Sequence, residues 1–217
     1  MRLFARPKAA PVVIPYKLLS VLLLYPDEPI VEAEDEINSA VAGLPASPVK
    51  DLLERFCAYW TSLTATERAQ NYVTTFDLQK RSSLYLSYYV FGDQRQRGMA
   101  LLRLKRLYAA AGFVLTGREL ADYLPLMLEF AELAPVECRD AVLGEYRPAI
   151  EVLRQSLRER ESPYADLLDA LCSGLPELDT LQGDSVRRVI AEGPPSEQVG
   201  LDPFMPPEIM SDRGARR

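Results

Sequence analysis

Histidine is absent from the 217-residue sequence. It is the commonest general base and the commonest metal ligand in proteins. Its absence excludes a Ser–His or Cys–His nucleophile and argues against zinc or haem sites. It also argues against a di-iron site at Glu129 and Glu132, because such bundles use Glu-x-x-His motifs. Any catalysis would therefore depend on carboxylates.

Cysteine is scarce, and the three present lie far apart at Cys57, Cys138 and Cys172. No Cys-x-x-Cys pair occurs, and an odd number cannot pair completely within one chain. We therefore expect reduced, buried thiols, as in a cytosolic protein. The glycine-rich motifs that cradle nucleotide phosphates, G-x-x-x-x-G-K-[ST] and G-x-G-x-x-G, are also missing.

Long apolar runs are missing as well. Val21–Leu24 is short, far below the ~20 residues needed to span a bilayer. No uninterrupted apolar stretch follows the basic residues of 1–11, so no signal peptide is predicted. We expect a soluble, cytoplasmic protein, which leaves open an association with a membrane complex through a partner.

An excess of positive charge is lacking too. The net charge is −6 and the isoelectric point about 4.9. Nucleic-acid binding needs a basic face, so nucleic acid is not expected as the main partner. The acidic balance does permit attraction to a basic peptide.

What the sequence does contain is apolar residues at helical spacing, with no segment that alternates as a strand would. We predict an all-α protein, a single helical-bundle domain of about eight to ten helices over residues 15–192. Prolines predict a flexible N-terminal arm over 1–14 and a disordered, Pro-rich tail over 193–217. The tail could still dock on a partner or on the protein itself through its apolar residues, which are Leu201, Phe204, Met205, Ile209 and Met210.

Capping side chains mark two helix starts in the first third of the chain. Ser47 is predicted to cap a helix with Pro48 at its first position. Thr64 and Glu67 form a capping box for the following helix, in which each side chain satisfies a free amide of the other residue.

A long helix is expected over residues 136–161. Pro148 should kink it or split it at Arg147, because proline inside a helix lacks the amide donor and clashes with the preceding turn. Glu151 and Arg154 are expected to belong to an exposed row of mixed charge.

The chain is organised around residues 72–113, which predict two helices joined at Gly92-Asp93. Gly92 suits the end of the first helix, and Asp93 is a candidate N-cap for the second. The first half is rich in tyrosine and leucine. Two interpretations stay open for its tyrosines: core packing with the hydroxyls at the rim, or a groove for another peptide.

Residues 114–125 form the most polar loop between two apolar helices, and two helix-start signals compete there. Thr116 and Glu119 form one capping box, and Asp122 is a second candidate N-cap. A helix continuous from Thr116 would place Pro125 in its interior at roughly 3 kcal/mol. We therefore expect a short turn over 116–121 and a helix that starts at Asp122.

Three stretches carry a family resemblance: Arg81–Tyr89 (RSSLYLSYY), Gly92–Leu102 (GDQRQRGMALL) and Ala111–Phe113. In order, spacing and identity they resemble the central segment of the NarJ family, the delta subunits or molybdenum-cofactor assembly chaperones of respiratory nitrate reductase. Weaker similarity extends from about Pro15 to about Leu178.

The loop that follows resembles the wider redox-enzyme chaperone group that includes TorD and DmsD. Its pattern in the NarJ family is Glu-Leu-Pro-Asp-His. Ala121 stands here where the family has proline, and Tyr123 where it has histidine. The residues that match are Glu119, Leu120, Asp122, Leu124 and Pro125.

The resemblance implies an all-helical, system-specific chaperone rather than an enzyme. Its expected partner is the N-terminal region of the nitrate reductase catalytic (alpha) subunit, bound before membrane docking. The molybdenum-guanine dinucleotide cofactor would belong to that client, so that no cofactor is expected to be bound permanently. In this group the loop is associated with recognition of a leader peptide.

The residues themselves are compatible with a peptide site. The acidic loop lies next in sequence to a helix pair rich in Tyr and Leu, which could accept a basic amphipathic leader. Asp122 and Glu119 could equally serve only as helix caps, and Arg81, Arg95 and Arg97 could pair internally or contact acidic parts of the client. The predicted peptide-binding residues are Arg81, Tyr85, Tyr88, Tyr89, Glu119, Asp122, Tyr123, Leu124 and Pro125.

Two alternatives come from other classes of protein. One is a structural or scaffold subunit that is retained in a redox complex. The other is a small all-α enzyme that works with carboxylates.

Overall fold

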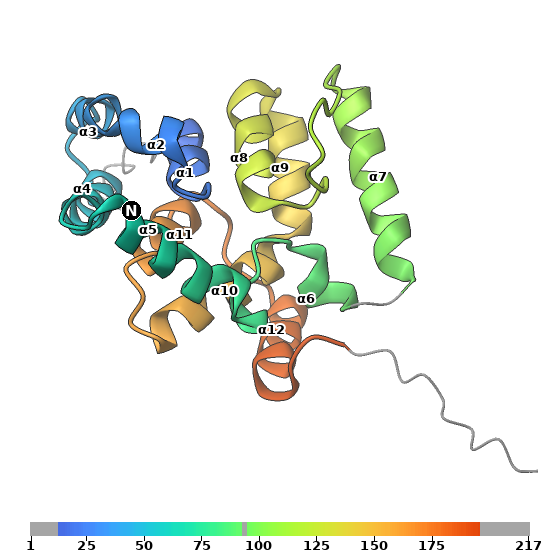
Figure 1. Ribbon diagram of the computed structural model, residues 1–217. Helices are drawn as coiled ribbons and strands as arrows, with labels where there is room; N and C mark the ends of the chain where they lie inside the picture. The colour runs from blue at the N-terminus through green and yellow to red at the C-terminus, as the bar shows by residue number, and fades with distance from the viewer. Residues whose placement is uncertain (1–12, 93–94, 196–217) are drawn as a thin grey trace, which may run out of the picture.

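The computed structural model describes residues 13–92 and 95–195, and this part of the chain folds into helices without a strand (Figure 1). The prediction of an all-α protein is confirmed. The described α-helices number twelve, above the predicted eight to ten. They are α1 (Tyr16–Leu22), α2 (Glu28–Glu32), α3 (Glu34–Ala42), α4 (Pro48–Thr61), α5 (Ala65–Tyr72), α6 (Ser87–Phe91), α7 (Gln96–Ala110), α8 (Leu124–Leu133), α9 (Val136–Glu145), α10 (Arg147–Glu159), α11 (Ala165–Cys172) and α12 (Thr180–Glu192).

Two stretches of the described chain are divided into consecutive helices. Residues 28–42 form two helices, α2 and α3, and Asp27 caps the first by accepting from the Ile30 amide at 3.3 Å. The helix expected over 136–161 is split into α9 and α10 immediately before Pro148, as predicted.

Both predicted helix starts of the first third are confirmed. The Ser47 hydroxyl accepts from the Lys50 amide at 3.2 Å and begins α4. The Thr64 amide donates to the Glu67 carboxylate at 2.8 Å, and the Glu67 amide donates back to the Thr64 hydroxyl at 3.3 Å. This reciprocal pair begins α5.

Helix α10 lies at the centre of the molecule. It contacts α6, α9, α11 and α12, while α11 packs against α4 and α1 packs against α8. Figure 1 accordingly shows α1–α5 on one side of α10 and α7–α9 on the other. Phe56, Phe76 and Tyr164 form an aromatic cluster in the core, with ring centroids 4.8 to 5.0 Å apart along Phe56–Tyr164 and Phe76–Tyr164.

The ends of the described chain pack against the domain. Ile14, which the prediction placed in the N-terminal arm, is buried with its side chain over Gly174. Pro195 lies against Gly92. The remainder of the predicted arm and tail, residues 1–12 and 196–217, falls outside the described residues, and so does the predicted N-cap Asp93.

The prediction of one continuous helix before Gly92 is wrong. A π-helical turn, η1 (Val73–Asp77), follows α5, and a 3₁₀ turn, η2 (Lys80–Ser82), comes next. Only the short α6 then leads to Gly92, whose φ of 55° confirms a conformation that glycine adopts easily. The chain leaves the helical path after Asp77, where Gln79 is extended, and the Ser83 hydroxyl later accepts from the Tyr85 amide at 3.2 Å.

The prediction that Glu151 belongs to an exposed row is also wrong, since its side chain is buried between two arginines. Arg147 donates to Glu151 Oε2 at 3.0 Å, and Arg154 donates to Oε1 at 2.6 Å. Arg154 continues to Asp169 of α11 at 3.1 Å. Burial alone would raise the pKa of Glu151, but the hydrogen bonds from Arg154, Gln155 and Arg147 lower it to about 2.

We predict that Glu151→Gln lowers the free energy of unfolding by about 3 kcal/mol, because it leaves Arg147 buried without its counter-charge. The folded-state pKa of Glu151 lies below its unfolded value of 4.5, so its contribution is full above pH 4.5 and is lost as the pH falls towards 2. Urea denaturation at pH 7 and pH 3 should therefore show a smaller difference between variant and parent at pH 3.

The matched control is Glu159→Gln, an exposed carboxylate on the same helix. It should change the stability by less than about 0.5 kcal/mol. Equal effects of the two substitutions would contradict the assignment of Glu151 as the centre of the network.

Candidate functional site

The loop 119–125 is fixed to the segment 84–87 by backbone hydrogen bonds. The Leu86 amide donates to the Asp122 carbonyl at 3.0 Å, and the Leu124 amide donates to the Leu84 carbonyl at 2.8 Å. Tyr85 and Tyr123 thereby form an isolated antiparallel bridge in an otherwise helical structure. The pairing brings the first stretch that carries the family resemblance, Arg81–Tyr89, into direct contact with the loop that matches the family pattern.

Asp122 adds a buried ionic link to this pairing. Its side chain is 0% exposed, and its Oδ2 accepts from the Ser87 amide at 3.0 Å and from the Ser87 hydroxyl at 2.6 Å. Arg97 of α7 donates to the same hydroxyl at 3.0 Å and lies 3.7 Å from Oδ2. The other oxygen, Oδ1, has no hydrogen-bond partner among the described residues.

The prediction that Asp122 caps the helix after the loop is therefore wrong. Helix α8 begins at Leu124, and its N-cap residue Tyr123 makes no capping side-chain bond. Asp122 instead binds the first residue of α6, which precedes it by 35 positions. Thr116 and Glu119 do not form a capping box either, because no helix begins between them and Leu124.

Three tyrosines continue from the loop towards the core. The Tyr85 and Tyr123 rings lie 5.2 Å apart, and the Tyr123 hydroxyl is 3.1 Å from that of Tyr72. Tyr72 also donates to the Leu23 carbonyl at 3.2 Å, so Tyr123 is the donor to Tyr72. At the outer end, the Tyr85 hydroxyl donates to Glu119 at 2.9 Å.

These hydroxyls are donors throughout the physiological pH range. Burial, followed by the hydrogen bond and charge of Glu119, raises the pKa of Tyr85 well above its usual value. Burial also raises the pKa of Tyr123, which stands at the position of the family histidine. Protonation near neutral pH, which a histidine would allow, is therefore not available at this position.

The nine predicted peptide-binding residues divide by exposure. Tyr89, Asp122, Leu124 and Pro125 are buried, and the Tyr89 hydroxyl donates to backbone carbonyls of the preceding turn. In this structure these four do not form the surface that a peptide would touch. The surface is contributed by the other five, of which Arg81 and Glu119 are exposed and Tyr85, Tyr88 and Tyr123 are half-buried.

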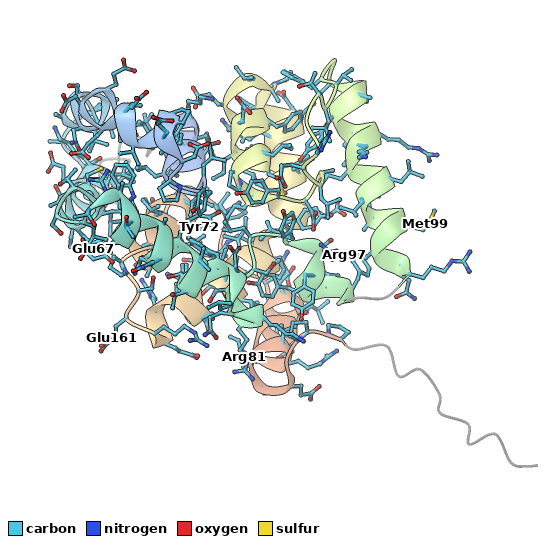
Figure 2. The ribbon with its side chains drawn as sticks, in the orientation of Figure 1. Glu67, Tyr72, Arg81, Arg97, Met99 and Glu161 are labelled. Carbon is cyan, nitrogen blue, oxygen red and sulfur yellow. The ribbon has the colours of Figure 1, made fainter. Side chains whose placement is uncertain are left out.

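A depression of about 360 Å³ opens beside this surface. Tyr85 and Tyr88 form part of its wall, and Figure 2 shows Arg97 between α6 and α7. The residues that line it are Phe76, Asp77, Gln79, Lys80, Ser83, Tyr85, Tyr88 and Arg97. The sequence did not identify Phe76, Asp77, Gln79 and Lys80 as site residues, because the break in the helix after Tyr72 was not predicted.

The described part of the chain offers little for metal chemistry. Within residues 13–92 and 95–195, no group of three or more Cys, Asp or Glu side chains is placed to hold a metal ion. The same residues include no helix with the length and apolar character required to cross a bilayer. The chemistry of the depression is that of aromatic rings, hydroxyls and charges of both signs.

Comparisons with known proteins agree with the sequence resemblance. A family model described as "Nitrate reductase delta subunit" matches residues 44–170, which include both the loop 119–125 and the segment 84–87. The probable nitrate reductase molybdenum cofactor assembly chaperone NarJ of Bacillus subtilis is 35% identical over 165 residues, 76% of this chain and 90% of that protein.

Two further relatives are longer than the region they share with this chain. The nitrate reductase molybdenum cofactor assembly chaperone NarJ of Escherichia coli K12 is 35% identical over 158 residues, 71% of this chain and 66% of that protein. The nitrate reductase-like protein NarX of Mycobacterium tuberculosis is 34% identical over 157 residues, 72% of this chain and 24% of that protein.

We predict that Asp122→Ala lowers the free energy of unfolding by about 1.5 to 3 kcal/mol, the usual contribution of a hydrogen bond to a buried charged group. Urea denaturation of the variant measures this loss. Glu119→Ala in the same loop is the control, and it should change stability by less than about 0.5 kcal/mol because Glu119 is exposed. A loss as large in Glu119→Ala would show that the pairing is not centred on Asp122.

Proposed function

Because the chain belongs to the nitrate reductase delta subunit family, we propose that it is an assembly chaperone for nitrate reductase. Relatives that carry the name of molybdenum cofactor assembly chaperone support this role. The protein would act in the cytoplasm by binding an immature client. It would catalyse no reaction of its own.

The proposed client segment is the N-terminal region of the catalytic (alpha) subunit, bound before that subunit docks at the membrane. The chaperone would hold the apoenzyme in a state that accepts its molybdenum-guanine dinucleotide cofactor. The cofactor would remain with the client throughout. Release would follow when the mature subunit no longer presents the bound segment, because the chaperone has affinity only for the immature form.

One observation supports a peptide site more than any other: the docked loop places the Tyr85–Glu119 pair beside the depression next to α6. The aromatic rings of Tyr85 and Tyr88 supply apolar surface with polar edges. Glu119 at one side and Asp77 in the wall supply negative charge. An amphipathic peptide could place its apolar side chains on the rings and a basic group near these carboxylates.

Charges of the opposite sign restrict the choice of peptide. Lys80 and Arg97 line the same depression, and Arg81 is exposed in the adjoining turn. Asp122 is buried beside Arg97 and offers no charge to the outside. A uniformly basic peptide would therefore be repelled from one side, whereas a peptide with one basic end would fit both sides.

The four buried members of the predicted set would act by positioning. Asp122, Leu124 and Pro125 hold the loop in place, Pro125 by accepting from the Ser20 hydroxyl, and Tyr89 fixes the turn before α6 through its hydroxyl. A rigid site has less ordering entropy to lose on binding than a mobile loop would.

We expect a synthetic peptide of the first residues of the catalytic subunit from the same genome to bind in an isothermal titration. Glu119→Lys should weaken binding about tenfold, which corresponds to 1.4 kcal/mol, because it places a positive charge where the basic end of the peptide would lie. Chemical-shift changes in an NMR titration should include the amides of residues 85–88 and 119–123.

The control variant is Glu137→Lys, which makes the same charge change at an exposed residue of α9 outside the depression. It should leave the affinity unchanged. If high micromolar peptide produced no heat and no chemical-shift change, the proposed function would be rejected. Equal weakening by both variants would reject the assigned surface but not peptide binding itself.

A further inference from the structure

Helix α7 presents a face that the described residues leave open. It contacts α6 and α9, and of its side chains only Leu104 and Tyr108 are buried. Met99 is 67% exposed and Leu102 42% exposed, and Figure 2 shows Met99 on the outer side of α7. Met99 and Leu102 are three residues apart, so they lie on one face of the helix.

This face borders a groove of about 460 Å³, which is separate from the depression beside Tyr85. Its lining combines apolar and basic side chains, and Arg103 is paired with Glu145 at 3.2 Å. Arg106 lies one turn further along the same face and is exposed. The residues that line the groove are Phe91, Gln96, Met99, Ala100, Leu102, Arg103, Arg106 and Glu145.

The sequence after Pro195 is complementary to this groove. Residues 197–212, EQVGLDPFMPPEIMSD, contain four acidic residues and no basic one. The same stretch carries the apolar residues that the function proposed above does not use. Its acidic residues are Glu197, Asp202, Glu208 and Asp212, and its large apolar residues are Val199, Leu201, Phe204, Met205, Ile209 and Met210.

The described chain also ends next to the groove. The carbonyl oxygen of Pro195 lies 1.6 Å from the position that a Cβ on Gly92 would take, so the two backbones are in direct contact. Gly92 is adjacent to Phe91, which lines the groove, and precedes the first residue of α7 by four positions.

The length of the segment is sufficient for it to cover α7. A helix of the length of α7 spans roughly 22 Å, whereas residues 197–212 could span up to about 50 Å when extended. Pro203, Pro206 and Pro207 disfavour a helix in this segment, so an extended conformation along the groove is expected.

We propose that residues 197–212 bind in the α7 groove of the same molecule. Apolar side chains around Phe204 and Met205 would cover Met99 and Leu102, and the carboxylates would lie near Arg103 and Arg106. An occupant tethered to the same chain has a high effective concentration, so it would exclude weaker acidic ligands from the groove. The site and its occupant are independent of the client peptide proposed above.

The full-length protein offers a direct test through its methionines. Of its five, Met99 lies in the groove, Met205 and Met210 lie in the segment, and Met127 is buried in α8. With ¹³C-methyl methionine labelling, we expect a nuclear Overhauser effect between the Met99 methyl and the methyl of Met205 or Met210. Phe204→Ser together with Ile209→Ser should abolish it and shift the Met99 resonance, while the Met127 resonance stays in place.

Leu181→Ser is the matched control, since it removes an exposed leucine of α12 that does not line the groove. It should leave the Met99 resonance unchanged. The proposal would be overturned if Met205 and Met210 had random-coil methyl shifts and the Met99 resonance were unchanged in the segment variants. Cross-peaks that vanish on dilution as a dimer dissociates would overturn it as well, because they would assign the groove to a second copy.

Discussion

The pairing of residues 84–87 with the loop 119–125 is the interaction on which the rest of the site depends. It is a short antiparallel backbone contact between segments that are otherwise far apart in sequence, and Asp122 reinforces it from within. The backbone amides of Leu86 and Ser87 both donate to Asp122, to its carbonyl and to its carboxylate respectively. The Tyr85–Glu119 pair and the wall that Tyr85 contributes to the depression both depend on this single contact.

Buried charge has a specific task in this fold. Asp122 ties α6 and α7 to the loop, and Glu151 ties α10 to α11 through Arg154 and Asp169. Buried ion pairs contribute little net stability compared with apolar packing, but they tolerate few alternative arrangements. Helical bundles can slide or rotate along apolar faces, and a carboxylate that must meet two or three fixed donors removes that freedom. The acidic composition of the chain is therefore used partly inside the protein.

The sequence was sufficient for the fold class and for those helix ends that depend on neighbouring residues. Ser47, the Thr64–Glu67 box and Pro148 act within one turn of the chain, so their effects could be predicted. The roles of Asp122 and Glu151 could not, because each depends on which distant residues meet it in the folded state. Helical spacing alone describes Glu151 and Arg154 as an exposed pair, and only the packing of α11 against α10 shows them to be internal. In the predicted site, burial separates residues that position the loop 119–125 from residues that a ligand could reach, and the sequence alone could not make this division.

The contact between Gly92 and Pro195 has a consequence for the order in which the protein matures. Gly92 leaves the ribosome long before Pro195 does, and domains begin to fold from the N-terminal side during synthesis. The joint between α6 and α7 thus stays uncovered on the nascent chain until translation has passed α12. The Gly92–Pro195 contact therefore forms only late in synthesis. On a ribosome stalled before α12, the nascent chain would leave the joint between α6 and α7 exposed.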